Sequence, residues 1–269
     1  MNHILLSPPD FYTVDYEINP WMHVREKPDS ALAVEQWNGF YDCLKTLGLK
    51  IETISPAEGL PDMVFTANGG LVYGNKFIVS NFRHKERQNE SDLFENWFRE
   101  RGYEIIKLPK SHFFEGEGDA FILGDTLVAG FKFRSHIQSH KFIGEVLKKR
   151  VLSLELIQPE FYHLDTCFCP LDDKSALYYP DAFDDYGVKA LAHLIPDLIA
   201  VNSDDALNFC CNAVVRGHNI IMNNCSRELK THLSERGYNL HLFDFSEYIK
   251  AGGSAKCLTL WLDRYGTKG

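Results

Sequence analysis

Two short segments of the sequence hold side chains that could perform nucleophilic and acid–base chemistry. The segment FYHLDTCF places His163 and Asp165 two residues apart, and Cys257 follows the glycine-rich GGSAK. A histidine near a carboxylate is a candidate general acid or base, although a single histidine is more often a buried structural residue. A cysteine after a flexible loop is a candidate nucleophile when a histidine acts with it, although most free cysteines are inert. Together the two segments predict a Cys-His catalytic pair.

Two other segments supply carboxylates and an amide. FEGEGD places Glu115, Glu117 and Asp119 within five residues, and PDMVFTAN begins near Asp62 and ends at Asn68. Three carboxylates this close repel one another unless a cation lies among them or they point in different directions. Each segment alone also fits a solvated turn. The order along the chain, with carboxylates first, then a histidine and then a late cysteine, favours a catalytic site.

These segments need a fold that brings them together, and a recurring pattern predicts one. Five helical patterns each run into a glycine or another break and are followed at once by a short apolar strand. The helical patterns span 31–47, 92–101, 142–150, 186–195 and 226–236, and the strands begin at Leu49, Tyr103, Val151, Asp197 and Tyr238. Alternating hairpins with glycine-containing turns start at Leu71, Phe121 and Ala213.

The repeating unit is therefore strand, strand, helix, strand. Units of this size cannot bury their apolar faces alone, which favours a ring of small sheets with the helices outside; an ordinary open α/β sheet is the alternative. On a ring, strand ends from different units meet in one central pocket. We expect a strand to open at Asp62, a second to place His163, Asp165 and Cys167 on one face, and a third to contain Cys257.

Composition and charge exclude several classes of protein. The 269 residues include 45% hydrophobic and 24% charged side chains, which is typical of a globular protein, and the formal net charge is −9 at pH 7. The negative charge disfavours nucleic acid as a partner and suits a cationic small substrate, although acidic surfaces also serve solubility. No apolar run is long enough for a membrane helix, and the first residues lack a signal sequence. We expect a cytoplasmic protein that does not bind membranes.

The cysteines do not form a disulfide or metal-binding framework. They are seven in number and irregularly spaced, at Cys43, Cys167, Cys169, Cys210, Cys211, Cys225 and Cys257. An odd number without a CxxC pair indicates reduced thiols and disfavours a zinc site. A metal-dependent enzyme is therefore the least favoured interpretation.

The segments described above resemble the pentein, or guanidine-modifying, superfamily, which includes arginine deiminases, dimethylarginine dimethylaminohydrolases, amidinotransferases and arginine dihydrolases. The resemblance extends over nearly the whole chain, from PPDFYTVDYEINPWM through PDMVFTANGG, NFRHKERQNE, FEGEGD, YHLDTCFCPL and NFCCNAV to GGSAKCLTLWL. It is strongest to the arginine dihydrolase domain, whose members convert arginine to ornithine, carbon dioxide and two ammonia. The implied fold is an α/β propeller, a five-bladed ring of ββαβ units, with residues 1–269 as a single catalytic domain.

The resemblance also implies roles for ten residues. It makes Cys257 the nucleophile, His163 the general acid/base and Glu115 the carboxylate that supports the histidine and the substrate. The implied substrate-binding residues are Asp62 and Asp165 for the guanidinium, Arg87 and Arg134 for the substrate carboxylate, and Asn68, Phe65 and Asn19 for other pocket contacts. The expected partner is a cationic guanidine such as arginine, without a cofactor or a metal, and a homo-oligomer is possible.

Two departures from the superfamily pattern leave alternatives open. Deiminases usually have a second carboxylate where this chain has Asn68. An amide can both donate and accept hydrogen bonds, so our hypothesis is that Asn68 permits a second hydrolysis, from citrulline to ornithine. The spacing of FEGEGD also leaves open whether Glu115 or Glu117 is the working carboxylate. The alternative functions are a deiminase or dimethylarginine hydrolase that gives citrulline, and a non-catalytic arginine-binding module.

Overall fold

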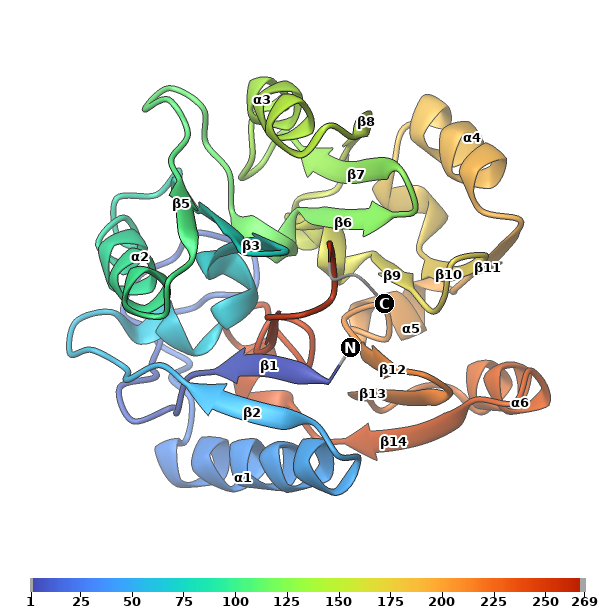
Figure 1. Ribbon diagram of the computed structural model, residues 1–269. Helices are drawn as coiled ribbons and strands as arrows, with labels where there is room; N and C mark the ends of the chain where they lie inside the picture. Colours follow the sequence, from blue (N-terminus) through green and yellow to red (C-terminus); the bar gives the residue numbers. More distant parts are fainter. Residues whose placement is uncertain (1, 267–269) are drawn as a thin grey trace.

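Five three-stranded sheets form a ring around one axis, and the longer helices cover the outside of the ring (Figure 1). The computed structural model describes residues 2–266. In every sheet two strands pair antiparallel, and a third strand, which follows a helix, pairs parallel with one of them. The predicted pentein fold of five ββαβ units is confirmed, and the open sheet is excluded because the strands form five separate sheets.

Each sheet with its helix is one blade of the ring. The strands, grouped by blade, are β15 (Leu260–Trp261), β1 (His3–Leu6) and β2 (Lys50–Thr53); β3 (Gly70–Tyr73), β4 (Lys76–Val79) and β5 (Glu104–Ile106); β6 (Ala120–Leu123), β7 (Thr126–Phe131) and β8 (Arg150–Glu155); β9 (Phe168–Pro170), β10 (Ser175–Tyr178) and β11 (Asp197–Ala200); and β12 (Val214–Arg216), β13 (Asn219–Asn223) and β14 (Asn239–Phe243). The helices are α1 (Ser30–Thr46), α2 (Glu90–Glu100), α3 (Ile137–Leu147), α4 (Asp185–Leu194), α5 (Ser203–Leu207), α6 (Arg227–Glu235) and α7 (Ser246–Ile249). Within residues 2–266, no helix combines the length and apolarity that crossing a bilayer requires.

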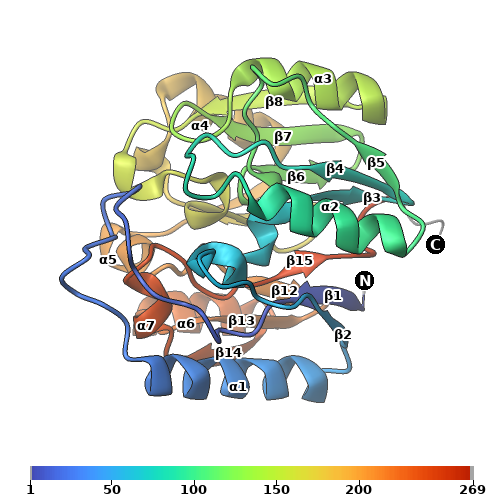
Figure 2. The same cartoon turned by 90° about the vertical axis from the view of Figure 1, so that its left-hand side faces the viewer.

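The first blade joins segments from opposite ends of the sequence. β15 pairs antiparallel with β1, which places Trp261 opposite Ile4, and the two strands lie side by side in Figure 2. The Thr66 hydroxyl lies 2.9 Å from the carbonyl oxygens of both Leu5 and Leu258. The segment that contains Cys257 is therefore fixed against the N-terminal strand.

The helix-to-strand passages follow from local signals in the sequence. At the start of α1, the Asp29 carboxylate accepts hydrogen bonds from the amides of Ala31 and Leu32, which caps the helix. After its end, Gly48 has a φ of 78°, a left-handed conformation that glycine adopts without a steric penalty, and the chain turns into β2. Gly102 and Gly237 end α2 and α6 in the same way, so the five predicted passages are confirmed to within one residue of each strand start.

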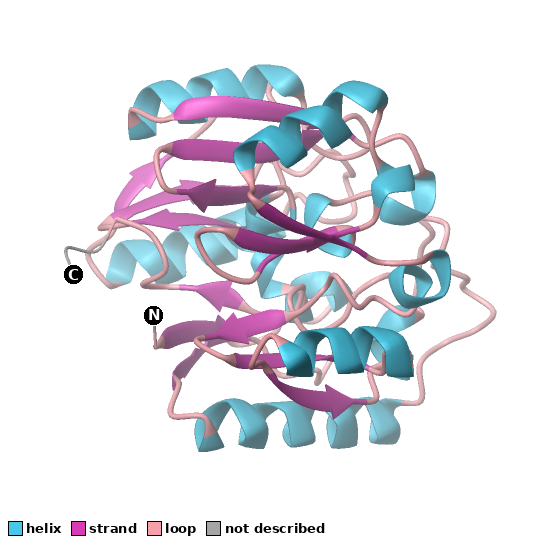
Figure 3. Cartoon of the chain, turned by 90° about the vertical axis from the view of Figure 1, so that its right-hand side faces the viewer, coloured by secondary structure: helices cyan, strands magenta, loops and turns pink. Residues whose placement is uncertain are grey.

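The core lies where neighbouring blades meet, inside the helices, which Figure 3 shows above and below the strands. One cluster joins Ile4, Phe40 and Trp261 of the first blade to Ile221 of the last. Burying an aliphatic or aromatic side chain contributes roughly 1.5–3 kcal/mol, so these contacts hold the ring closed. Cys257 belongs to the same cluster and is 2% exposed.

Three strands predicted for the site segments are wrong. Asp62 lies in a 3-10 helix, Pro61–Val64, and a second 3-10 helix, Leu164–Thr166, follows His163. Proline at the first helical position and the bond of 2.7 Å from the Thr166 hydroxyl to the His163 carbonyl favour tight turns there. Cys257 lies in a turn before β15. The apolar alternation that suggested strands arises because these loops are buried at the centre of the ring.

Candidate active site

Each blade contributes one buried segment that lies immediately before its first strand. Asn68 precedes β3, Asp119 precedes β6, Asp165 precedes β9, Asn212 precedes β12 and Cys257 precedes β15, in each case by one to three residues. These five strands occupy equivalent places in the ring, so their N-terminal ends converge at one end of the axis. The predicted convergence of strand-end residues from different units is therefore confirmed. The residues themselves lie in short helices and turns that precede the strands, and not in the strands.

The candidate acid–base group of this site is a buried cluster of His163, Glu115 and Arg134. Glu115 Oε2 lies 2.9 Å from His163 Nε2 and 2.8 Å from Arg134 Nη1, and all three residues are at most 2% exposed. Burial alone would raise the pKa of Glu115, but the charge of Arg134 and the His163 hydrogen bond lower it below its ordinary value. Burial lowers the pKa of His163 to about 4, against the opposing effect of Glu115.

The His163 ring is therefore neutral near pH 7 and has a defined orientation. A carboxylate accepts hydrogen bonds only, so Nε2 carries the hydrogen that bonds to Glu115, and Nδ1 remains as the basic nitrogen. Nδ1 faces Gly118, where a Cβ would lie 3.3 Å away. Near the other imidazole nitrogen, Asp119 Oδ2 lies 3.9 Å from Nε2. The same oxygen accepts a hydrogen bond of 2.6 Å from the Ser135 hydroxyl.

The nucleophile candidate is a buried thiol next to a buried carboxylate. Cys257 Sγ lies 3.5 Å and 3.7 Å from the two carboxylate oxygens of Asp165, and the amide Nδ2 of Asn212 donates to the sulfur at 3.1 Å. Burial raises the pKa of the Cys257 thiol well above its ordinary value, and the charge of Asp165 adds to this effect. Burial also raises the pKa of Asp165 to about 7, although Lys256 opposes the shift. The charge of Lys256 favours both ionised forms, but its Nζ pairs with Glu117, and no ion pair to Asp165 is present within residues 2–266.

A second polar network surrounds Arg87. Its guanidinium makes two hydrogen bonds of 2.8 Å to Glu90, and Nη1 donates to Asn68 Oδ1 at 2.9 Å. Its Nε lies 3.7 Å from Asp62 Oδ2. Because Arg87 binds the amide oxygen, the Asn68 NH₂ group points away from it, toward Gly118, where a Cβ would lie 2.3 Å from Nδ2.

Two polar atoms of this network are buried without a hydrogen-bond partner in the described part of the chain. They are Asn68 Nδ2, a donor, and Asp62 Oδ1, an acceptor. Burial raises the pKa of Asp62, against the opposing charge of Arg87. A buried polar atom without a partner is costly, so both atoms are suited to bind a polar ligand.

The structure brings the other predicted residues into the same region. Arg134 Nη2 donates to the Ile18 carbonyl, and its guanidinium lies over the Tyr162 ring at 4.6 Å. Phe65 packs against Gly253, and Asn19 Nδ2 donates to the Ala251 carbonyl at 3.1 Å. Both residues therefore line the loop that leads to Cys257.

The two glutamates that the sequence left as alternatives, Glu115 and Glu117, have different partners in the structure. Glu115 binds His163, whereas Glu117 binds Lys256 Nζ at 3.0 Å and makes no contact with the histidine in the described structure. Cys167, expected on the face of His163, instead points its thiol at the carbonyl oxygens of His163 and Leu164.

Sequence reasoning missed Asn212, Lys256 and Glu90. Asn212 stands two residues before its hairpin strand, as Asn68 does before β3, and this equivalence was the available signal. Lys256 and Glu117 pair across 139 positions of sequence, which no local pattern reports. Among residues 2–266, no cluster of three or more metal-binding side chains is present.

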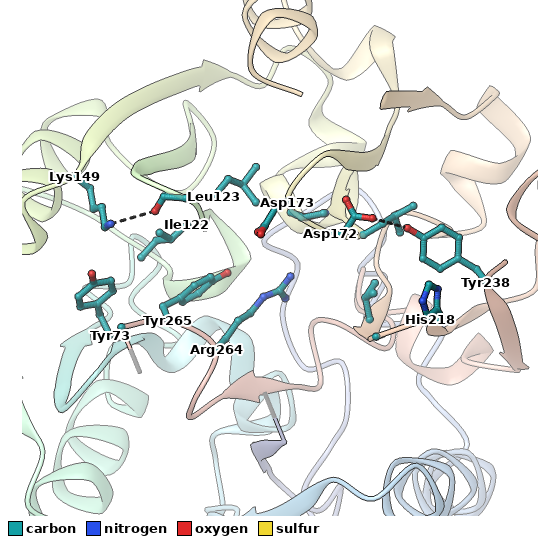
Figure 4. A pocket seen from close by; sticks show the side chains of 16 residues that line it. Tyr73, Ile122, Leu123, Lys149, Asp172, Asp173, His218, Tyr238, Arg264 and Tyr265 are labelled. Carbon is teal, nitrogen blue, oxygen red and sulfur yellow. Dashed lines mark hydrogen bonds between the residues drawn. The ribbon is translucent and has the colours of Figure 1, made fainter. Parts of the chain in front are cut away.

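A cavity of about 580 Å³ opens at the opposite end of the ring, at the hairpin turns between the first two strands of the blades (Figure 4). Arg264, Tyr265, Tyr73 and Asp172 line it, and Figure 4 shows Arg264 projecting into its centre. None of the ten predicted site residues borders this cavity. The cavity and the buried polar site are therefore separate places in the structure.

Comparisons with known proteins identify relatives of this chain. Residues 15–262 match the family model described as eukaryotic N,N dimethylarginine dimethylhydrolase. The chain is 48% identical over 262 residues to the bifunctional arginine dihydrolase/ornithine cyclodeaminase ArgZ of Synechocystis sp., covering 96% of this chain and 37% of ArgZ. It is 40% identical over 255 residues to the N(G),N(G)-dimethylarginine dimethylaminohydrolase of Mycobacterium tuberculosis, covering 95% of this chain and 84% of that protein.

A solved structure of the N-terminal domain of ArgZ has the same fold. It is a variant with one asparagine replaced by serine, covalently bonded to a reaction intermediate, with a TM-score of 0.95 and 45% identity over 99% of both chains. The chain thus spans little more than a third of full-length ArgZ but nearly all of this N-terminal domain.

Proposed function

This chain belongs to the N,N dimethylarginine dimethylhydrolase family, and from that membership we propose that it hydrolyses the guanidinium group of arginine. The proposed products are ornithine, carbon dioxide and two ammonia, and residues 1–269 are proposed to form one catalytic domain. The similarity to ArgZ supports this reaction over others of the family, since the identity is higher and extends over the ArgZ N-terminal domain. The ornithine cyclodeaminase activity in the name of ArgZ is not part of the proposal.

One observation supports a guanidinium substrate more than any other. The Asp165 carboxylate is fully buried beside the Cys257 thiol, and within residues 2–266 it forms no ion pair. A buried carboxylate without a cation is electrostatically unfavourable, and its raised pKa of about 7 expresses that cost. A guanidinium bound between Asp165 and Asp62 would offset the cost and bring its carbon to the sulfur.

The first half of the proposed reaction uses Cys257 and His163. The bound cation lowers the pKa of the thiol, the proton passes to His163, and the thiolate attacks the guanidinium carbon. The imidazolium, stabilised by Glu115, protonates one amino group of the resulting tetrahedral adduct, and that group leaves as ammonia, with an S-alkylthiouronium remaining on Cys257. Neutral His163 then takes a proton from water, hydroxide attacks the same carbon, and the thiolate leaves with citrulline as product.

The second half requires the site to hold a neutral ureido group. We propose that the Asn68 NH₂ group donates to the ureido oxygen, a contact that a carboxylate cannot supply. Its support is the free donor of Asn68, which Arg87 orients through the amide oxygen. A second thiolate attack releases the second ammonia, and hydrolysis of the thiocarbamate gives a carbamate that decomposes to ornithine and carbon dioxide.

A dimethylarginine dimethylaminohydrolase is the second candidate, because the Mycobacterium tuberculosis relative of that name is matched over 84% of its length. Incubation of the protein with arginine, citrulline, agmatine and methylated arginines, followed by mass identification of the products, separates the two. The expected result is ornithine from arginine, with citrulline as a transient. Citrulline and dimethylamine from dimethylarginine alone would establish the second candidate. Stable citrulline from arginine would identify a deiminase, and binding without turnover would identify a non-catalytic module.

A further inference from the structure

We propose that Asn212 of the fifth blade is the residue that positions Cys257 and stabilises its thiolate. The inference rests on the proposed role of Cys257 as nucleophile and adds a residue to it. Asn212 is fully buried, and its Nδ2 lies 3.1 Å from Cys257 Sγ.

The orientation of the Asn212 amide follows from its neighbours. Its Oδ1 accepts hydrogen bonds from the backbone amides of Ser254 at 3.2 Å and Cys257 at 3.1 Å, which are donors only. Its Nδ2 donates to the carbonyl oxygen of Asp165 at 3.0 Å, which is an acceptor only. The opposite assignment of nitrogen and oxygen would place donors against donors, so the remaining N–H must point at the sulfur.

Asn212 also links the two segments that contain the thiol and its neighbouring carboxylate. Besides the side-chain bonds, its carbonyl oxygen accepts from the Lys256 amide at 3.2 Å. Residues 254–257 therefore have three of their backbone amides bound to one residue, and the His163–Asp165 segment is bound through the Asp165 carbonyl. Cys257 lies in a turn and not on a strand, so within the described chain no backbone hydrogen bonds to a neighbouring strand fix its position. The hydrogen bonds to Asn212 take that part.

A donor aimed at sulfur matters more for the thiolate than for the thiol. A hydrogen bond to a charged acceptor is stronger than one to a neutral acceptor, so the Asn212 N–H favours ionisation of a group whose pKa burial raises. Backbone amides of the first residues of a helix often serve such a sulfur, and the described structure has no long helix beginning at Cys257. The Ser254 backbone amide and the Asn212 side-chain amide both lower the pKa of the thiol here, and Asn212 is the side chain that supplies such a donor.

The test compares Cys257 reactivity in Asn212→Asp and Asn212→Ser with a matched control. Asn223→Ser is the control, because Asn223 is a buried asparagine of the same blade that also bridges two backbone groups, Asn208 and Phe245, and does not contact Cys257. The rate of iodoacetamide labelling of Cys257 is followed from pH 6 to 10 by peptide mass analysis, with the melting temperature measured for each protein. Asn212→Asp keeps the acceptor oxygen and adds a charge, and Asn212→Ser guards against misfolding caused by that charge.

The expected result is a labelling profile displaced to higher pH in both Asn212 variants, with labelling below the thiol pKa slowed about tenfold for each pKa unit. In Asn223→Ser the profile stays at the position of the unaltered protein even if the melting temperature falls. Equal profiles in all four proteins would overturn the inference, and so would a displacement in the control as large as in the Asn212 variants. The readout is chemical labelling, so it stands even if arginine is not the substrate. A failure of the proposed function is recognised separately, because the unaltered protein would then give no ornithine from arginine.

Discussion

The Cys257 thiol lies 3.5 Å from a carboxylate oxygen of Asp165, and both groups are buried to the extent that their neutral forms are favoured. Two acidic groups in contact oppose each other's ionisation, and a bound cation would favour the ionised form of both. In the proposed reaction the guanidinium of arginine is such a cation, and it is also the group attacked. The proposed mechanism therefore couples formation of the Cys257 thiolate to binding of the substrate.

Replacement of the nucleophile should separate binding from turnover. Cys257→Ser is expected to abolish ammonia release from arginine, because a serine hydroxyl ionises far less readily than a thiol. Arginine binding, measured by calorimetry, is expected to persist because Asp62 and Asp165 remain. Substantial residual turnover would assign the nucleophile elsewhere. Cys167→Ser is the matched control, since the Cys167 thiol is committed to the carbonyl oxygens of His163 and Leu164.

Asn68 should decide which product leaves the enzyme. In Asn68→Asp, the donor to the ureido oxygen is lost, and a carboxylate that favours the cation takes its place. The expected result is that citrulline replaces ornithine as the product. At most one mole of ammonia is then released per mole of arginine consumed. Time courses of both products by mass spectrometry measure this. Ornithine output that equals that of the native chain would refute the role given to Asn68.

Stability should depend on pH through Asp165. The pKa of this carboxyl is raised from its ordinary value of 3.8 to about 7, so the folded protein binds the proton more tightly than the unfolded chain. Its contribution to stability is complete below about pH 4 and is lost as pH rises through 7. Asp165→Asn should therefore gain stability relative to the native chain between pH 4 and pH 8, by on the order of 2–4 kcal/mol.

Denaturant unfolding at pH 4, 6 and 8 measures that difference for the two proteins. Comparison of the pair isolates Asp165 from Glu90, whose pKa burial also raises to about 7, and from His163. Added arginine should stabilise the native chain at pH 8 more than it stabilises Asp165→Asn. A difference between the two proteins that does not change with pH would contradict the assignment.

The buried Lys256–Glu117 pair should affect both stability and the thiol. Lys256→Met leaves Glu117 buried without its cation, which typically costs about 3–5 kcal/mol. It also removes a positive charge that lowers the pKa of Asp165 and of Cys257. The double variant Lys256→Met with Glu117→Leu should recover most of the stability, measured by denaturant unfolding. Labelling of Cys257 should remain slow in both variants, and recovery of the labelling rate in the double variant would show that Lys256 acts on stability alone.

The ring of five units was predictable because its signals are local. Glycines such as Gly48 and Gly102 follow three of the five outer helices, and each of these five helices leads into a strand within a few residues, so the repeat can be recognised in the sequence. The strands assigned to Asp62 and His163 were wrong because alternation of apolar side chains reports burial, and loops at the centre of a ring are buried as deeply as strands. Asn212 had only an indirect signal, its place two residues before a hairpin strand, because the residues that it contacts lie more than forty positions away.

The pairing of β15 with β1 has a consequence for the order in which the ring can form. Of the strands in residues 2–266, β1 is made first and β15 last, so the first sheet can be completed only after the residues around Cys257 have been made. Contacts between residues so distant in sequence form slowly, because a long loop must close before they are gained. A chain that has not yet made β15 can consequently complete four of the five sheets but not the first, and the proposed nucleophile is placed by the same pairing that closes the ring.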